Sequence, residues 1–121
     1  LPLLQSLRDL GWRVFYVVKG GPIQNDLSHQ DLADADLYAA LEPVVDTGAC
    51  TVGLELAQTS PEFQRLFAAA DLILAKGMGH FETLSHLPDP RLFFLLQAKC
   101  PPVAAALDVA VGAFVLRAAC F

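Results

Sequence analysis

Residues 71–83 read DLILAKGMGHFET, an apolar run that leads into a lysine and two closely spaced glycines. Positions 72–75 are apolar without interruption, as in a strand that is buried on both faces. The glycines at 77 and 79 predict a tight turn, and the following GHFETLSHL predicts a short helix. Neither a buried strand nor a tight turn requires an ammonium group, so Lys76 calls for a separate explanation.

The rest of the chain repeats this alternation of apolar runs, glycine turns and helical patterns. We expect helices over about 1–10, over 28–41 (one helix or two short ones) and from Ser60 as N-cap to about 69. We expect strands over 12–18, 71–75, 91–99 (RLFFLLQAK, which fits a helix equally well by periodicity) and 112–118, short extended pieces in VVDTG and CTVGLEL, and a turn or short helix in PVAAALDV. The pattern predicts an α/β fold in which a largely parallel sheet carries helices on both faces.

The composition excludes several classes of protein. The net charge is −5 and the basic residues do not cluster, which argues against a nucleic-acid partner. The most lipid-like window, about 101–116, is interrupted by Asp108 and is too short to span a membrane. The 3 cysteines lack the spacing of a disulfide framework or a zinc site, so we expect reduced thiols in the core. We find no targeting pattern and expect a cytoplasmic protein.

The apolar fraction is high for the length of the chain. Of 121 residues, 55% are hydrophobic, which suits one domain with a large core. A sequence cropped from a larger protein would also show this excess, because it would carry surfaces that normally face the missing part. The sequence begins with Leu1 inside an amphipathic pattern, LPLLQSLRDLG. We therefore expect one α/β domain over 1–121 that is a fragment of a larger protein, incomplete at its N-terminus.

The loop AKGMGHFE is a candidate phosphate site. In a parallel sheet, ligands collect at the carboxyl ends of the strands, where this loop is expected. Gly77 and Gly79 would let backbone N–H groups approach an anion, and Lys76 would add a full positive charge. The alternative is that Lys76 extends from the strand end into water and that the two glycines only form the turn.

A second loop, KGGPIQND, follows the first predicted strand and presents Asn25 and Asp26. A carboxylate at this position suits a hard divalent cation such as Mg²⁺ or Mn²⁺. The alternative is an Asx turn or a helix cap. The residues alone leave both interpretations open.

Taken together, KGGPIQND and ADLILAKGMGHFETL resemble the DUF89 family of ARMT1-like, metal-dependent damage-control phosphatases. The tail FFLLQAKCPPVAAALDVAVGAFVL resembles the closing segment of the same family. The resemblance implies a Rossmann-like α/β domain with an N-terminal helical part. It also implies hydrolysis of small phosphomonoesters, such as sugar phosphates or other phosphorylated metabolites, with Mn, Co, Ni or Mg as cofactor.

The resemblance also suggests roles for individual residues. Asp26 matches a metal-ligating aspartate and Lys76 matches a lysine expected to contact phosphate, so these two are the expected catalytic residues. The substrate-binding residues that it implies are Asn25, Gly77, Gly79, His80 and Glu82. His80 stands where the family usually has asparagine. The family's DNAGE-type motif, with two further metal ligands, would lie upstream of Leu1, so activity is expected of the full-length protein.

Two other functions remain open on the sequence. The glycine loop could hold a phosphorylated ligand without metal or catalysis. The chain could instead be a structural domain that associates through exposed apolar faces, including with a second copy of itself.

Overall fold

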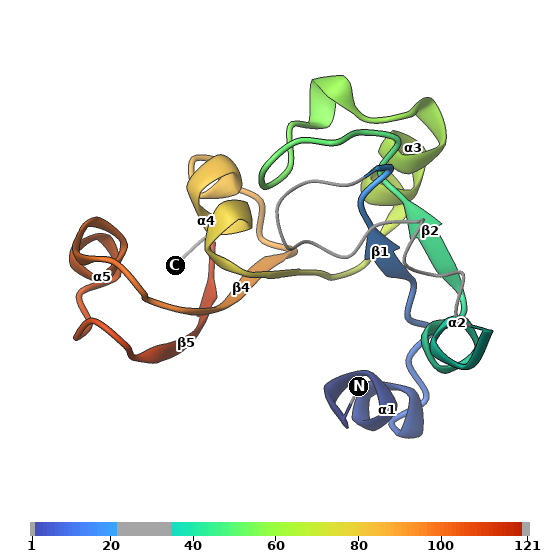
Figure 1. Cartoon of the computed structure of the whole chain (residues 1–121), viewed down its shortest axis with the longest axis horizontal. Helices are drawn as coiled ribbons and strands as arrows, with labels where there is room; N and C mark the ends of the chain where they lie inside the picture. Colours follow the sequence, from blue (N-terminus) through green and yellow to red (C-terminus); the bar gives the residue numbers. More distant parts are fainter. Residues whose placement is uncertain (1, 22–34, 120–121) are drawn as a thin grey trace. The chain divides into compact units, whose positions relative to one another are not determined.

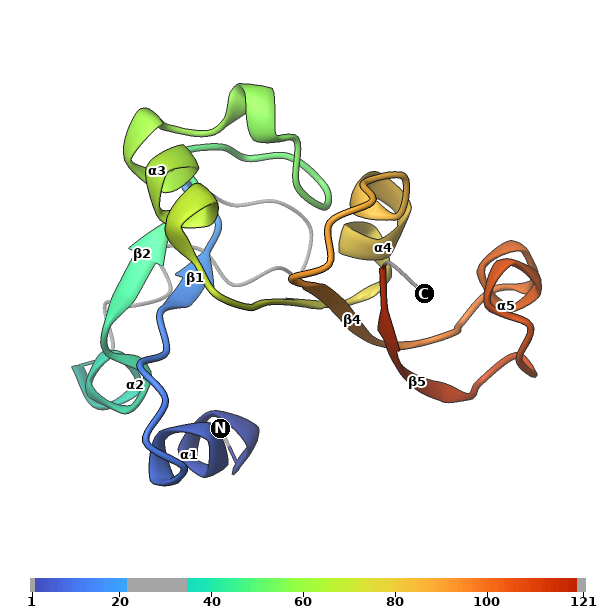
Figure 2. The ribbon, with the colours of Figure 1, turned by 180° about the vertical axis from the view of Figure 1, so that it is seen from behind.

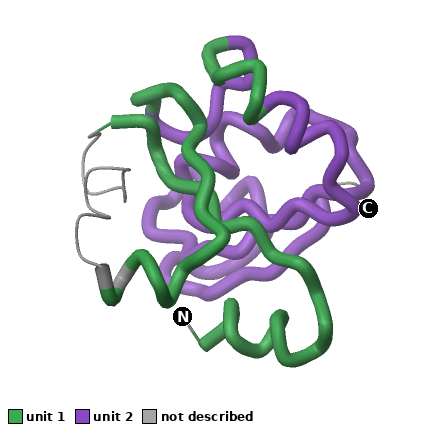
Figure 3. Tube along the Cα trace, turned by 90° about the vertical axis from the view of Figure 1, so that its right-hand side faces the viewer, with its two compact units in different colours: residues 1–51, 58–63 green, residues 52–57, 64–121 purple. Residues whose placement is uncertain are grey.

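In a computed structural model, residues 2–21 and 35–119 of the chain are described (Figure 1). They divide into two compact units, coloured separately in Figure 3. Unit 1 comprises the residues up to Thr51 together with Gln58–Phe63, and unit 2 comprises Val52–Ala57 together with the residues from Gln64 onward. The expectation of one domain over the whole chain stays a prediction.

Unit 1 is built around a short parallel strand pair. It contains α1 (Pro2–Asp9), β1 (Tyr16–Val18), α2 (Ala35–Leu41) and β2 (Val44–Asp46), with β1 and β2 parallel. Leu4, Val18 and Leu41 form its buried core. From α1, Arg8 donates hydrogen bonds to the last carbonyls of α2 and to the Glu42 carbonyl. A cation at a helix C-terminus satisfies carbonyls that the helix leaves without partners.

The first strand is shorter than the sequence predicts, because it begins at Tyr16 rather than at residue 12. Its partner β2 has only three residues, and Pro43 immediately before it lacks an N–H group. The Tyr16 N–H donates to the Pro43 carbonyl at 2.9 Å, which is where the ladder starts. Among the described residues, none therefore pairs as a strand with residues 12–15. Residues 28–34 of the predicted second helix lie outside the described part of the chain, and α2 covers the remainder.

A turn at residues 46–49 fixes the carboxyl end of this strand pair. The Asp46 carboxylate accepts a hydrogen bond from the Gly48 N–H at 2.8 Å, and Gly48 adopts the left-handed φ of 71°. The Gly20 N–H donates to the Ala49 carbonyl at 2.9 Å. A Cβ atom on Gly20 would lie 2.7 Å from the Ala49 nitrogen, so this approach requires glycine.

Unit 2 contains a three-stranded sheet in the order β3-β4-β5 (Figure 2). Its strands are β3 (Ile73–Lys76), β4 (Leu92–Gln97) and β5 (Phe114–Ala118), and its helices are α4 (Met78–Leu84) and α5 (Pro101–Leu107). The short 3-10 helix η2 (Leu56–Gln58) begins in unit 2 and ends in unit 1. Helix α3 (Pro61–Ala69) begins in unit 1 and continues into unit 2. The Ser60 hydroxyl accepts a bond from the Phe63 N–H at 3.2 Å, which confirms the predicted N-cap.

The described strands form two small sheets in a mixed α/β arrangement. The β3-β4 pair is parallel, as predicted, but β4 and β5 are antiparallel. The connection between β4 and β5 closes on itself, because the Ala98 N–H donates to the Ala113 carbonyl at 2.8 Å. Helix α5 lies within this closed connection. Strand β5 therefore begins beside the residue at which β4 ends. An antiparallel edge strand on a parallel sheet is common in α/β proteins.

Burial alternates along β4, with Leu92, Phe94 and Leu96 buried and the residues between them half-buried. The buried face packs against α4, where the Phe81 and Phe94 rings meet edge to face at 5.3 Å. On the same face, Arg117 of β5 donates to the Leu107 carbonyl of α5 at 2.9 Å. The core of unit 2 therefore lies between the sheet and these two helices.

Several smaller predictions have clear outcomes. The strand interpretation of RLFFLLQAK, the closing strand and the helices at 2–9, 61–69 and 78–84 are confirmed. The predicted extended piece CTVGLEL is wrong: residues 50–55 form no strand, and Gly53 has a φ of 67°, which is incompatible with extended structure. Cys50 is exposed and Cys100 is half-buried, so the expectation of core thiols is wrong for these two. Within 2–21 and 35–119, the helices are too short or too polar to cross a bilayer.

Candidate functional site

Lys76 is the last residue of β3, where the strand leaves the sheet. It pairs in register with Leu95 of β4, and its side chain is exposed. Lys76 therefore sits at the carboxyl end of a parallel pair, the position at which ligands bind in open α/β sheets. An exposed ammonium group here is available to a ligand in solution.

Gly77 turns the chain from β3 into α4 and has a φ of 109°. This left-handed conformation strongly favours glycine, since a Cβ atom would be strained there. The Gly77 N–H donates to the Leu95 carbonyl at 2.9 Å, which extends the β3-β4 ladder by one bond. The Gly77 N–H is thus already bonded within the sheet. The conformation of Gly77 sets the direction in which α4 begins.

Gly79 lies in the first turn of α4, where the segment 52–54 packs against the helix. A Cβ atom on Gly79 would be 3.2 Å from the Gly53 nitrogen. A Cβ atom on Gly53 would be only 2.2 Å from the Gly79 carbonyl oxygen. Two glycines therefore allow the two backbones to touch, and this contact is sufficient to explain Gly79 without a ligand.

Thr83 holds this contact together. Its hydroxyl donates to the Gly79 carbonyl at 2.9 Å and accepts a hydrogen bond from the Leu54 N–H at 2.9 Å. One side chain thus ties the 52–54 segment to the helix that follows Lys76. Sequence reasoning missed both Gly53 and Thr83, although the isolated glycine inside the apolar CTVGLEL was a signal of close backbone approach.

His80 is tied to the end of β3. Its Nδ1 atom lies 2.8 Å from the Lys76 carbonyl oxygen. Because a carbonyl oxygen only accepts, Nδ1 carries the hydrogen in this contact, and Nε2 is the acceptor of the neutral ring. The structure thus brings His80 and the Lys76 backbone together.

Glu82 is exposed on α4, two positions beyond His80. Residues two apart on a helix point to different sides, so Glu82 and His80 do not share a face. The substrate-binding assignment of Glu82 stays a prediction.

Asn25 and Asp26 lie outside the described residues, so their position relative to Lys76 is a prediction. Lys19, at the start of the same loop, directly follows β1, and its side chain is buried, with 5% exposed. Within 2–21 and 35–119, no three residues among His, Cys, Asp and Glu form a group that could hold a metal ion. The described residues alone therefore do not fit a metal site.

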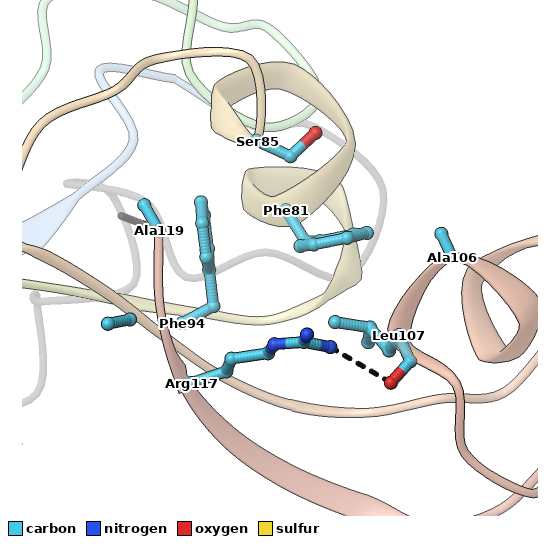
Figure 4. A pocket seen from close by; sticks show the side chains of 8 residues that line it. Phe81, Ser85, Phe94, Ala106, Leu107, Arg117 and Ala119 are labelled. Carbon is cyan, nitrogen blue, oxygen red and sulfur yellow. Dashed lines mark hydrogen bonds between the residues drawn. The ribbon is translucent and has the colours of Figure 1, made fainter. Parts of the chain in front are cut away.

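A cavity of about 230 Å³ lies on the covered face of the unit 2 sheet (Figure 4). Its lining is mostly apolar, with the Arg117 guanidinium at one side: Phe81, Ser85, Phe94, Ala106, Leu107, Arg117, Ala118 and Ala119. Phe94 and Leu95 are neighbours on β4 and point to opposite faces, and Lys76 pairs with Leu95. The cavity and the Lys76 side chain therefore belong to opposite faces of the sheet.

The sequence matches known proteins along almost its whole length. The family model described as the damage-control phosphatase ARMT1-like domain matches residues 1–115. A damage-control phosphatase of Pyrococcus horikoshii is 46% identical over 114 residues, covering 93% of this chain and 39% of that protein. A damage-control phosphatase of Archaeoglobus fulgidus is 35% identical over 115 residues, covering 95% of this chain and 40% of that protein.

A solved structure has the same fold. The crystal structure of a DUF89 family protein from Pyrococcus horikoshii matches with a TM-score of 0.86 at 45% identity. The match covers 96% of this chain and 41% of the solved chain. The chain thus spans about 40% of the length of the relatives it matches, as expected for part of a larger protein.

Proposed function

The chain belongs to the ARMT1-like damage-control phosphatase domain family, and on this basis we propose that the full-length protein is a phosphatase that hydrolyses small phosphomonoesters with a divalent metal ion. The observation that carries the proposal is the family match over residues 1–115. The position of Lys76 supports it, because an exposed ammonium group at the carboxyl end of a parallel strand suits a phosphate ligand.

Lys76 is proposed to bind the phosphoryl group and to stabilise the negative charge that develops on its oxygens during transfer. A charge placed in advance at such a point is among the largest contributions to catalysis. The left-handed Gly77 and the Gly79–Gly53 contact hold α4 at the strand end. They would position Lys76, and the substrate-binding assignment of Gly77 and Gly79 stays a prediction.

His80 is proposed to contact the substrate. Its Nδ1 contact with the Lys76 carbonyl orients the ring next to the proposed phosphate site. The neutral ring would accept a hydrogen bond from a hydroxyl group, such as those of a sugar phosphate. Asn25 and Glu82 are proposed as further substrate contacts on the family resemblance alone.

Asp26 is proposed as one ligand of the metal ion, with the others supplied by the full-length protein outside this sequence. Carboxylate oxygen is a preferred ligand of Mg²⁺ and Mn²⁺. When bound, the ion would polarise a phosphoryl oxygen and lower the pKa of a bound water. We further propose that the protein acts in the cytoplasm on a phosphorylated metabolite.

The test is phosphate release by the full-length protein. Sugar phosphates and a simple aryl phosphate are offered with Mn²⁺, Co²⁺, Ni²⁺ or Mg²⁺, and with EDTA. We expect turnover with at least one metal and none with EDTA, and Asp26→Ala should abolish it. An absence of metal-dependent turnover across these substrates would contradict the proposal.

Lys76 is tested with two substitutions and a matched control. Lys76→Ala should lower kcat/KM by about 100-fold, as expected for the loss of one charge that stabilises the transition state. Lys76→Arg should retain part of the activity, since it keeps the charge but changes the geometry. Arg65→Ala removes an exposed cation of α3 and should leave kcat/KM unchanged. Equal values for Lys76→Ala and Arg65→Ala would remove Lys76 from the site.

A further inference from the structure

The Thr83 hydroxyl makes one hydrogen bond that its place in a helix explains and one that it does not. It donates to the Gly79 carbonyl at 2.9 Å, and the His80 carbonyl lies 3.4 Å away. A threonine inside a helix commonly bonds back to a carbonyl of the preceding turn in this way. The bond that the same oxygen accepts from the Leu54 N–H, at 2.9 Å, comes from outside the helix and needs another reason.

The segment 52–54 depends on this second bond. Leu54 is buried, with 6% of its surface exposed, and residues 50–55 form no strand that could bond its N–H in a ladder. A buried N–H group without a partner is costly, and the Thr83 hydroxyl supplies the partner. A Cβ atom on Gly53 would lie 2.4 Å from the same hydroxyl oxygen. Thr83 and the segment therefore fit each other closely.

The first turn of α4 lies between this segment and the end of β3. Gly79 and His80, whose carbonyls are next to the Thr83 hydroxyl, belong to that turn. The His80 Nδ1 atom bonds to the Lys76 carbonyl at 2.8 Å. The turn is thus held to the last residue of β3 by His80 and to the segment 52–54 by Thr83.

We propose that Thr83 is a positioning residue of the phosphatase site. By holding the first turn of α4 on the segment 52–54, it fixes the strand end from which Lys76 reaches the phosphoryl group. It acts through the backbone of Gly79 and His80 and does not itself touch the substrate. This inference rests on the proposed function, because it concerns the placement of Lys76. A small displacement of a catalytic group can lower a rate by orders of magnitude.

The experiment compares variants of the full-length protein on the substrate that gives turnover in the phosphate-release test. Thr83→Val removes the hydroxyl at nearly the same side-chain volume and should lower kcat/KM by about 10-fold. Thr83→Ser keeps the hydroxyl and should stay within about twofold of the unsubstituted protein. The control is Ser85→Ala, which removes an exposed hydroxyl from the other end of α4 and should leave kcat/KM unchanged.

A double-mutant cycle with Lys76→Ala separates positioning from a general loss of structure. If Thr83 acts through Lys76, Thr83→Val should lower kcat/KM by less than about twofold once Lys76 is already alanine. A smaller fraction of folded enzyme would instead lower kcat/KM by the same factor whether Lys76 is present or absent. The ratio of the two factors is therefore the decisive measurement.

The outcomes distinguish this inference from the proposed function. Equal factors in the two backgrounds, or a Thr83→Ser variant as impaired as Thr83→Val, would overturn the role of Thr83 and leave the phosphatase assignment standing. An unsubstituted protein without metal-dependent turnover would contradict the phosphatase assignment and overturn both.

A measurement on the unsubstituted protein covers the case in which Thr83→Val does not fold. Hydrogen exchange at residue resolution gives the rate of the Leu54 amide. We expect this rate to be at least about 100-fold slower than that of an unprotected peptide, because the amide exchanges only when the segment opens away from Thr83. Exchange at the unprotected rate would show that Thr83 does not hold the segment, and the proposal would fall.

Discussion

At the scale of single residues, the contact between Gly53 and Gly79 sets how closely the 52–54 segment approaches α4. Each glycine leaves room for the other backbone, and the Thr83 hydroxyl bonds to both segments. The position of α4 relative to Lys76 therefore depends on the absence of two Cβ atoms that are distant in sequence.

Gly53→Ala should be strongly destabilising. The new Cβ atom would be 2.2 Å from the Gly79 carbonyl oxygen, at a φ of 67°. Backbone strain and overpacking together should cost about 2–4 kcal/mol. Gly112→Ala is the matched control, because Gly112 also has a positive φ but open space around it, so only strain of about 1 kcal/mol is expected. Denaturant unfolding followed by circular dichroism measures both, and equal losses would contradict the packing argument.

The ion pair between Asp89 and Arg91 predicts a pH dependence. Arg91 donates to the Asp89 carboxylate from Nε at 3.0 Å and from Nη2 at 2.7 Å. These hydrogen bonds lower the pKa of Asp89 from its ordinary value. A carboxyl group with a lowered pKa in the folded state adds stability above its unfolded pKa, and this stability is lost as pH falls through the folded pKa.

Asp89→Asn should therefore lower Tm at pH 7, and the difference from the wild type should narrow once the pH falls below about 4. Thermal unfolding at pH 7 and at pH 3 tests this. Arg91 also donates from Nη1 to the carbonyls of Phe67, Ala68 and Ala70 at the end of α3, and these bonds remain in the variant. A Tm difference that is the same at both pH values would rule out the carboxylate as its source.

At the scale of elements, α5 ends at a residue in an unusual conformation. Asp108 has φ 55° and ψ 49°, the left-handed region that usually holds glycine after a helix. Asp108→Gly should stabilise unit 2 by about 0.5 kcal/mol, because relief of strain slightly exceeds the entropy that glycine loses on folding. Asp108→Val should destabilise it by about 2 kcal/mol, since a branched Cβ is strained there. Urea unfolding that ranks the variants otherwise would contradict this account.

Most elements could be predicted from sequence because their signals are local. Ser60 and Pro61 mark the start of α3, and the pair Lys76 and Gly77 marks the end of β3. The prediction failed where structure depends on a distant partner. The length of β1 is set by Pro43 and β2, and the direction of β5 by the bonds between Ala98 and Ala113. The residues of β1 and β5 themselves carry no sequence pattern that reveals these distant partners.

The same distinction between local signals and distant partners applies to the candidate site. Lys76, Gly77 and His80 are near in sequence, and the structure places them together at one strand end. Gly53 and Thr83 are thirty residues apart, and pattern reasoning did not connect them. Asp26 was singled out by a motif, and its meeting with Lys76 remains a prediction to be tested by the Asp26→Ala and Lys76→Ala variants.

At the scale of the whole molecule, the two compact units have separate cores. Leu4, Val18 and Leu41 form one, and Leu92 and Phe94 are the largest fully buried side chains of the other. A core defect should therefore weaken one unit more than the other.

Leu92→Ala tests this separation. Leu92 is 0% exposed, and its truncation should cost unit 2 about 2–5 kcal/mol. Hydrogen exchange should accelerate in β3, β4 and β5 by a larger factor than in β1 and β2. Leu10→Ala is the control, because the Leu10 side chain is 72% exposed. It should leave the exchange rates of both strand groups unchanged. Equal acceleration in both strand groups would show that the two units unfold as one.

The closed connection around α5 has a practical consequence. Its ends are held together by the Ala98 N–H bond to Ala113 and the Gly112 N–H bond to Ala98, and Val111, the residue before Gly112, is exposed. An exposed turn between a helix and a strand is a site at which inserted sequence is best tolerated. A fluorescent reporter grafted between Ala110 and Val111 would follow the protein in cells while leaving the end of β3, where Lys76 sits, unaltered.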